Sequence, residues 1–454
     1  MTKRTLPEFG AWTLLATLGV LVAVTMPELG SGAWPFQPPS VDPRGIFGPL
    51  VRAADREWDL GILRSTAVLA GLAVAVVAAA TWRLRSWPRW AGIGLAAIVC
   101  AALLVPAVLL QVGLRDATEP WYYTNDSTYQ IELAGDLILD GENPYGHDYD
   151  GSGLERFYPA AHDQPAGFPQ VALRHFAYFP GTALTSAAWR LLPRPFDDYR
   201  LFVLLATLAL LPAALLFSGS LHWRLSIGAV LAANPLLVRG AWFGTADAPS
   251  LLALVLAFAL LARGRFVWAA ASLGAAVALK QFALVAVPFF AVMLLTVRAP
   301  RQALRQAAAA FAGVVAVCFL PFLVADPGAL WQDTVSYGAG TYRIIGYGLA
   351  AILFNAGVID DRFGYYPFVP LALLVWLPIT AWLLWSQRRA ASLWSGAAGF
   401  AISMFVLLFI SRVFQNSYLI WPLTGIALAL LLAGAGRSAR GLSSSEASAS
   451  GSAE

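Results

Sequence analysis

Carboxylates and histidines gather in one stretch of this chain, between residues 114 and 175. The stretch holds 11 of the 26 acidic residues and three of the four histidines. Asp126 stands out because it follows Trp121–Tyr123, an aromatic run typical of a membrane interface. A carboxylate at the boundary between lipid and water could take a proton from a hydroxyl group as a general base. The alternative is that Asp126 only caps a helix, which is a common role for aspartate.

Ionisable residues also occur inside or beside apolar segments. Lys280 divides two apolar runs, and Asp247 flanks another run at the same predicted face. Charged groups at such depth are costly, so they indicate a functional site or an ion pair between helices. Lys280 could bind a phosphate or pair with Asp247. Arg343 and Arg412 suit bidentate phosphate contact, and both could equally anchor the chain at the interface.

The histidines raise the question of a metal. His147, His162 and His175 are followed or preceded by acidic or polar residues, but their spacing matches no compact ligand motif. We therefore expect no required metal or other cofactor, with a divalent cation kept as the less favoured alternative. A polar surface loop is the simpler interpretation.

The elements that must position these residues are membrane helices. The chain has 454 residues, of which 59% are hydrophobic and 12% charged, about half the charged fraction of soluble domains. A bilayer-spanning helix needs about 20 mostly apolar residues. Candidate segments fall near 10–26, 63–82, 91–113, 176–192, 200–217, 224–240, 248–262, 266–279, 281–297, 306–324, 366–385, 394–411 and 417–433. The sequence therefore predicts an all-α, polytopic integral membrane protein. It has no basic face interleaved with aromatic residues, so a nucleic-acid partner is not expected.

Charge orients these helices. Short basic clusters between apolar runs, with the two chain ends, hold 14 Lys and Arg against three acids, whereas loops 27–62, 114–175 and 325–365 hold 8 Arg against 20 acids. The positive-inside rule places the basic clusters in the cytoplasm and the three loops outside. One segment between 176 and 240 then cannot be a full crossing. The segment 176–192 is the weakest, because Pro180, Gly181 and Arg190 interrupt it, so we expect a short or re-entrant helix there. About twelve spans remain, in the plasma (inner) membrane, with both termini cytoplasmic.

The outer loop 114–175 contains its own helix. Residues 128–140 place Ile131, Ala134, Leu137 and Ile138 at helical spacing, and Gly141 ends the pattern. We predict an amphipathic helix that lies on the bilayer surface. The tail 434–454 is rich in Ser, Ala and Gly and is expected to be disordered.

Several motifs carry a family resemblance. Asn125, Asp126 and Tyr129, followed by Gly141, Asn143, Pro144 and Tyr145, resemble the first-loop signature of C-type (GT-C) membrane glycosyltransferases. The closest resemblance is to the bacterial alpha-1,2-mannosyltransferase-like group, glycosyltransferase family 87. Further similar stretches are Tyr178–Gly181, Asn234–Pro235, Trp242–Asp247, Gly264–Pro288 and Phe414–Pro422. The likeness covers residues 91–433, so residues 1–90 are interpreted as two additional membrane helices.

The resemblance implies a reaction. The enzyme would move a sugar, mannose or another hexose or pentose, from a polyprenyl-phosphate donor to a lipid or glycan acceptor on the extracytoplasmic face. Asp126 would be the general base that deprotonates the acceptor. The predicted substrate-binding residues are Asn125, Tyr129, Tyr145, His147, Tyr178, Asp247, Lys280, Gln281, Arg343, Arg412 and Gln415. The alternatives are a multi-span lipid or sugar transporter or flippase, and a non-catalytic scaffold of similar fold.

Overall fold

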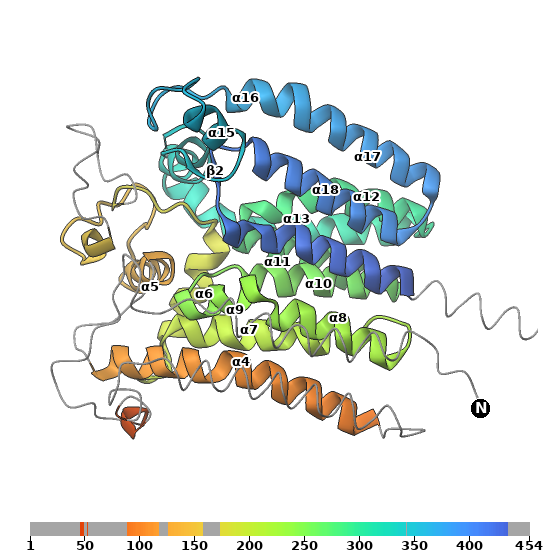
Figure 1. Ribbon diagram of the computed structural model, residues 1–454, viewed down its shortest axis with the longest axis horizontal. Helices are drawn as coiled ribbons and strands as arrows, with labels where there is room; N and C mark the ends of the chain where they lie inside the picture. The colour runs from red at the N-terminus through yellow and green to blue at the C-terminus, as the bar shows by residue number, and fades with distance from the viewer. Residues whose placement is uncertain are drawn as a thin grey trace, which may run out of the picture.

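Long apolar helices run side by side in the computed structural model of the chain, as Figure 1 shows. The structure describes residues 46–49, 52, 89–117, 126–157, 173–341 and 343–434. The predicted helices at 10–26 and 63–82, and the predicted tail beyond residue 434, lie outside the described residues. The resemblance-bearing segment 91–433 is therefore described in large part.

The first half of the described chain alternates long helices with short ones at one end of the bundle. Its elements are α4 (Arg89–Ala117), α5 (Asp126–Leu139), the 3-10 helix η1 (Leu154–Phe157), α6 (Pro180–Arg190), α7 (Tyr199–Ala214), α8 (Leu221–Ala233), α9 (Pro235–Phe243) and α10 (Ala248–Ala262).

The second half begins with α11 (Phe266–Leu279), the 3-10 helix η3 (Gln281–Val285), α12 (Ala286–Thr296) and α13 (Arg301–Ala325). An irregular stretch follows with α14 (Pro327–Trp331), the π-helix η4 (Gln332–Thr341), β1 (Ile345–Gly346) and α15 (Leu349–Asn355). The chain ends with α16 (Phe368–Leu371), the π-helix η5 (Ala372–Trp376), α17 (Leu377–Ala390), α18 (Leu393–Ile410), β2 (Val413–Phe414), the 3-10 helix η6 (Asn416–Leu419) and a C-terminal helix over 420–434.

Five of the described helical stretches are long and apolar enough to cross a membrane: Gly92–Gly113, Arg301–Ala325, Phe368–Ala390, Leu393–Ile410 and Asn416–Gly434. Shorter apolar helices of 10–17 residues accompany them at Tyr199–Ala214, Trp223–Val238, Ala248–Ala262, Phe266–Leu279 and Gln281–Thr296. The chain is thus a membrane protein built mostly of helices. The number of twelve spans stays a prediction, because two of the predicted segments fall outside the described residues.

Breaks in the apolar runs have local causes. Asn234 caps α9 by accepting a hydrogen bond from the backbone N–H of Leu237 at 3.0 Å, and Pro235 begins that helix, so the single predicted segment 224–240 is divided. Lys280 has an extended backbone with φ −153°, which separates α11 from η3. Both breaks expose polar groups to other elements at the end of an apolar helix.

The helix α6 is held between α5 and α11. A Cβ at Gly135 of α5 would lie 2.6 Å from Ser186 Oγ, and one at Gly181 would lie 2.7 Å from the backbone of Ala278. Glycine is required at both close approaches. With 11 residues, α6 spans about 16 Å, roughly half of the hydrocarbon thickness. The sequence prediction of a short helix at 176–192 is therefore confirmed.

The helix α5 begins at Asp126, two residues before the predicted boundary. Its buried residues include Thr128, Gln130 and Glu132 as well as the apolar Ile131 and Ala134. Polar contacts therefore bind α5 to the protein, which its apolar periodicity did not indicate.

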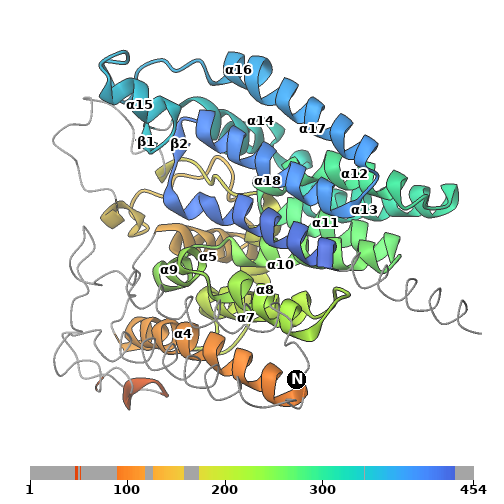
Figure 2. The same ribbon diagram turned by 45° about the vertical axis from the view of Figure 1, so that its right-hand side comes forward.

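The two ends of the bundle differ. Figures 1 and 2 place α5, α15 and the β1–β2 pair at one end, opposite the turn between α17 and α18. The two short strands run parallel, with Ile345 opposite Val413. This pair is the one departure from the predicted all-α fold within the described ranges. The described parts of the predicted outer loops 114–175 and 325–365 lie at the end that carries α5.

Candidate active site

Tyr178 stands at the centre of the polar residues that the sequence singled out. Its hydroxyl donates a hydrogen bond to Ser127 Oγ at 2.7 Å, and the Lys280 ammonium lies 4.8 Å from the centre of its ring. Burial raises the pKa of Tyr178 well above its ordinary value, and the negative charges of Asp126 and Asp247 raise it further. The phenol therefore stays protonated and acts as a hydrogen-bond donor, not as a base.

Lys280 pairs with Asp247, which was one of the two alternatives for these residues. The ammonium nitrogen lies 3.3 Å from Asp247 Oδ1. Trp421, at the start of the C-terminal helix, donates its indole N–H to the same oxygen at 3.1 Å. All three side chains are buried. An ammonium has three N–H donors, and Asp247 accepts from one of them. Lys280 can therefore donate to a ligand while it is paired.

Asp126 begins α5 and is half-buried. The next residue, Ser127, accepts the hydrogen bond from Tyr178. The charge of Asp126 acts on the Tyr178 phenol more strongly than that of Asp247 does. Asp126 is thus next to the residue that accepts the Tyr178 hydrogen bond, and Lys280 of the Asp247–Lys280 pair contacts the Tyr178 ring. We call Asp126, Ser127, Tyr178, Asp247, Lys280 and Trp421 the Tyr178 cluster.

Two polar atoms beside this cluster have no hydrogen-bond partner among the described residues. Thr128 Oγ1 follows Asp126 by two positions, and Gln281 Oε1 is next to Lys280; both atoms are buried. The Gln281 amide is held by its other end, which donates to the carbonyl of Ala177 at 3.3 Å. An unpaired buried polar atom costs about 1–3 kcal/mol. In the same part of the chain, buried polar atoms without a hydrogen-bond partner also occur at Ser186, Gln387 and Ser392, so Thr128 and Gln281 offer hydrogen-bonding capacity near the cluster without distinguishing it.

Tyr145 supports Tyr178 from the loop after α5. Its hydroxyl donates to the carbonyl of Tyr178 at 2.8 Å, and its ring packs edge-on against Phe176 and Phe322. Burial raises the pKa of Tyr145 well above its ordinary value. Tyr145 therefore stays neutral, and its hydrogen bond holds the backbone at Tyr178 in place.

A second polar group, outside the cluster, joins two outer loops. Asp333 Oδ1 lies 2.6 Å from His175 Nδ1. Its other oxygen accepts the backbone N–H groups of Gly146 at 2.9 Å and Phe176 at 3.2 Å. Asp333 thus binds the loop after α5 and the segment before Tyr178 to η4.

A third group, which we call the arginine clamp, joins α4, α5, α6 and α7. Arg115 lies 3.0 Å from Glu132, and Arg190 lies 2.8 Å from Asp136. Arg200 donates from Nη2 to Asp198 at 2.7 Å. The clamp consists of Arg115, Glu132, Asp136, Arg190, Asp197, Asp198 and Arg200.

Some predicted site residues lie away from Tyr178. Arg412 is buried and donates to the carbonyls of Gly364 at 2.8 Å and Arg362 at 3.0 Å, so the contacts described favour anchoring over phosphate binding. Arg343 is exposed in the loop before β1. Gln415 is half-buried before η6, where its carbonyl accepts the backbone N–H of Tyr418.

Two predicted residues of the loop region have structural contacts. Tyr129 is buried and its hydroxyl donates to the carbonyl of Ser152. His147 Nδ1 lies 3.8 Å from a Glu142 oxygen, at the surface. Asn125 lies outside the described residues. Among the described residues no three His, Cys, Asp or Glu side chains are placed to share a metal ion.

Sequence reasoning did not assign roles to Trp421, Phe282 or Asp333. Phe282 packs edge-on against Tyr418 and Trp421 and lies 5.9 Å from the Lys280 ammonium. Aromatic residues in apolar helices are common, so their types gave no signal. The available hints were the position of Phe282 two residues after Lys280 and the family-like stretch Phe414–Pro422, which contains Trp421.

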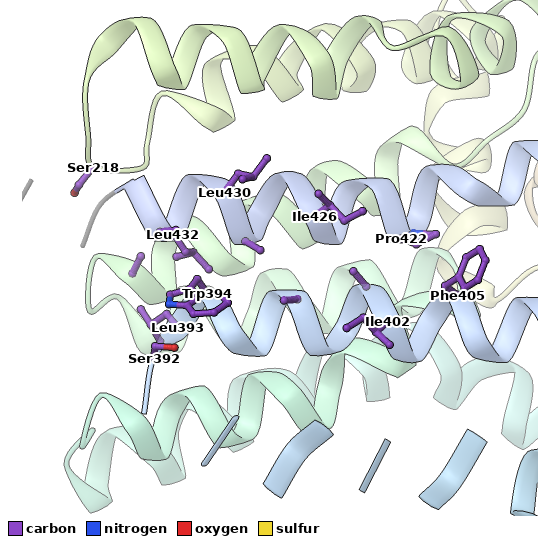
Figure 3. A pocket seen from close by; sticks show the side chains of 15 residues that line it. Ser218, Ser392, Leu393, Trp394, Ile402, Phe405, Pro422, Ile426, Leu430 and Leu432 are labelled. Atoms are coloured by element: carbon purple, nitrogen blue, oxygen red, sulfur yellow. The ribbon is translucent and has the colours of Figure 1, made fainter. Parts of the chain in front are cut away.

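An apolar cavity of about 1090 Å³ lies between α18 and the C-terminal helix. Figure 3 shows Ser218 and Ser392 at one end of it and Phe405 and Pro422 at the other. Pro422 adjoins Trp421, which holds Asp247. The cavity thus extends from the end opposite α5 toward the Tyr178 cluster.

These features define a multi-helix membrane protein with a buried acid–lysine–tyrosine cluster at one end. Residues 176–411 match the model of glycosyltransferase family 87, which is more than half of the chain. The chain therefore belongs to glycosyltransferase family 87 and is a glycosyltransferase. Comparison with curated proteins and with solved structures gives no match.

The family match covers part of the site. It includes Tyr178, Asp247, Lys280, Gln281 and Arg343. It begins after α5 and ends before Arg412 and Gln415, so it does not cover Asp126, and the base role of Asp126 stays a prediction. Membership in a transferase family sets aside the transporter alternative.

Proposed function

We propose that the enzyme transfers a sugar from a polyprenyl-phosphate donor to a hydroxyl group of a lipid or glycan acceptor, at the extracytoplasmic face, with Asp126 as the general base. The observation that carries this proposal is the arrangement around Tyr178. The Tyr178 hydroxyl donates to Ser127, the residue after the Asp126 carboxylate at the start of α5, and the Tyr178 ring lies 4.8 Å from the Lys280 ammonium at the break between α11 and η3.

The chemistry needs both groups. The acceptor oxygen attacks the anomeric carbon of the donor while its proton passes to the Asp126 carboxylate. The bond between the anomeric carbon and the phosphate oxygen breaks, and polyprenyl phosphate leaves with the bonding electrons. Negative charge develops on that phosphate, and the Lys280 ammonium, with its remaining donors, offsets it in a buried setting.

The cavity between α18 and the C-terminal helix supports a lipid-linked donor. Its lining is almost entirely apolar, with Ala401, Ile402 and Ile426 along its length. Ile402 and Ile426 are exposed on the side of the bundle, so the cavity opens laterally toward lipid. A prenyl chain in this cavity would lie along the helices with its phosphate near Pro422 and the Tyr178 cluster.

The direct test uses the purified protein in lipid nanodiscs with mannose and other sugars on polyprenyl phosphate. We expect one of these donors to be consumed and free polyprenyl phosphate to appear. A water-soluble nucleotide sugar is the control and should not react. Consumption of the nucleotide sugar, with all polyprenyl donors intact, would contradict the proposed donor class.

The cavity has its own test. Ala398→Trp and Ala429→Trp place bulk in its lining and should raise the KM for the donor severalfold. Leu374→Trp is the matched control, because Leu374 is 76% exposed on η5, away from the cavity. An unchanged donor KM in both lining variants would place the prenyl chain elsewhere.

The side of the membrane can be tested by labelling. Cysteine at Ser152 or Ser336, in the two outer loops, should react with a membrane-impermeant reagent added to intact cells. Cysteine at Ser392, at the opposite end of the bundle, should not react. Labelling from outside at Ser392 would reverse the predicted orientation, since the crossings tie all later loops to it.

A further inference from the structure

The imidazole of His175 is held on one side by Asp333. Asp333 is 1% exposed, and one of its oxygens accepts two backbone N–H groups. The other oxygen lies 2.6 Å from His175 Nδ1. An ionised carboxylate only accepts hydrogen bonds, so Nδ1 carries the hydrogen. In the neutral imidazole, this tautomer leaves Nε2 as a hydrogen-bond acceptor.

Other contacts fix the ring and its backbone. The Tyr337 ring lies 4.9 Å from the His175 ring at an interplanar angle of 30°. Gln130 of α5 donates its amide N–H to the His175 carbonyl at 2.9 Å. Within the described ranges the His175 side chain keeps 16% exposure, while that of Asp333 keeps 2%. The arrangement holds Nδ1 in place, and among the described residues no hydrogen bond to Nε2 is found.

His175 belongs to the same end of α5 as the Tyr178 cluster. Gln130 follows Asp126 by four residues, so the two side chains lie on one helix face. Tyr178 contacts Ser127, and the backbone carbonyl of His175 accepts from Gln130, on the first turns of that same helix. The backbone of His175, three residues before Tyr178 in the chain, therefore lies beside the helix that begins at Asp126.

We infer that His175 binds a hydroxyl group of the acceptor through Nε2, with Asp333 as its positioning residue. The inference rests on the proposed function, since it names the group that holds the second substrate. A hydroxyl supplies the hydrogen that the acceptor nitrogen needs. A phosphate oxygen does not, and it would also lie beside the negative Asp333. The ligand class is thus a neutral carbohydrate hydroxyl.

The test compares His175→Asn with His175→Gln. The asparagine amide can keep the contact with Asp333 from the Nδ1 position but lacks a group at Nε2, whereas glutamine can reach the Nε2 position. The acceptor probes are methyl glycosides of hexoses and pentoses, with the polyprenyl-phosphate sugar that the wild type consumes. His175→Asn should raise the acceptor KM roughly three- to tenfold, the loss of one hydrogen bond, and leave the donor KM unchanged. His175→Gln should recover part of this loss.

Monodeoxy glycosides sharpen the result. In the wild type, one deoxy position should raise the acceptor KM by the same factor as His175→Asn, and in His175→Asn that deoxy position should cost nothing more. Asp333→Asn should act in the same direction, because its amide N–H would donate to Nδ1 and turn Nε2 into a donor. A merely structural His175 would change both KM values or the unfolding temperature, without selecting one hydroxyl.

The wild type provides a measurement that needs no substitution. Diethylpyrocarbonate should acylate His175, and the acceptor glycoside should protect it while the donor alone does not, as read by mass spectrometry of the peptide. If the wild type transfers sugar to none of the glycosides, the proposed function falls and the inference with it. If transfer occurs but His175→Asn leaves the acceptor KM unchanged, the inference alone is overturned. If that variant does not fold, the wild-type protection experiment decides, and a lack of protection by the acceptor glycoside overturns the inference.

Discussion

The arginine clamp and the Tyr178 cluster both place charges around α5, and they differ in how those charges are satisfied. In the clamp, arginines from three helices form close ion pairs with carboxylates, often with two contacts each. In the Tyr178 cluster, the Lys280 ammonium pairs with Asp247 and lies among aromatic rings. Unpaired atoms of Thr128 and Gln281 border the cluster. The clamp, with its densely paired charges, is therefore expected to stabilise the fold, and the cluster is the region proposed to bind the ligand.

The largest expected effect is the loss of stability when the arginine clamp is broken. Arg200→Met leaves the fully buried Asp198 without its main partner, and removing one partner of a buried ion pair costs about 3–5 kcal/mol. Thermal unfolding in detergent should show a large fall in Tm. Arg174→Met, at an exposed position, should unfold like the wild type. An unchanged Tm for Arg200→Met would mean that the clamp does not hold the fold.

The next effect concerns the cluster. Lys280→Gln removes the ammonium and should weaken donor binding roughly 10- to 100-fold, the range for a hydrogen bond to a charged group. Tm should fall as well, because the buried Asp247 loses its ion-pair partner and keeps the N–H of Trp421. Arg343→Gln and Arg412→Gln are made beside it, since both arginines were predicted as phosphate ligands. Binding of the lipid donor to nanodisc-embedded protein decides between them. Wild-type binding by all three variants would place the phosphate elsewhere.

Gly244 lies between the two regions, so its substitution should affect both stability and turnover. A Cβ at Gly244 would lie 2.6 Å from Thr128 Oγ1 and 3.4 Å from Arg200 Cδ, and Gly244 has φ +72°. Gly264 has the same φ, and its Cβ would meet nothing within 4 Å. Gly244→Ala and Gly264→Ala should share a strain of about 1–2 kcal/mol. Only Gly244→Ala should also lower the turnover rate, and equal rates in the two variants would disprove this coupling.

The smallest effect is a dependence of stability on pH. Burial alone would raise the pKa of Asp198, but the charge and hydrogen bonds of Arg200, with the charge of Arg115, hold it below its ordinary value. A lowered folded-state pKa stabilises the protein above the unfolded pKa, and this stability is lost as pH falls below about 4. The slope is at most about 1.4 kcal/mol per pH unit for one group. Asp198→Asn should reduce the dependence of the free energy of unfolding on pH between pH 4 and 2. An unchanged slope of that free energy against pH would exclude the contribution of Asp198.

Sequence patterns predicted the helical membrane fold, the short helix at α6 and the grouping of Asp247 with Lys280. Apolar run length and basic clusters act locally, so a single sequence carries them. The contacts among Tyr178, Ser127 and Trp421 could not be predicted, because they join residues that are far apart along the chain. Arg412 illustrates the limit: its type and its predicted outer position suited phosphate, and only the structure shows its bonds to the carbonyls of Arg362 and Gly364.

The arginine clamp was missed for a related reason. Glu132 and Asp136 looked like the exposed face of an amphipathic helix, since they alternate with apolar residues. In the structure Glu132 is 3% exposed and accepts from the backbone of Tyr199 at 2.7 Å as well as pairing with Arg115. Buried acids and exposed acids have the same helical spacing, so only the partner distinguishes them.

The central claim is that Asp126 is the general base, and one comparison of variants tests it most directly. Asp126→Asn keeps the ability to cap α5 but cannot accept a proton at neutral pH. The turnover rate should fall on the order of 10²- to 10⁴-fold, while donor binding and Tm stay near wild type. Asp140→Asn, an exposed carboxylate just after the same helix, should leave the rate unchanged. An Asp126→Asn protein that folds, binds donor and turns over at nearly the wild-type rate would contradict the claim.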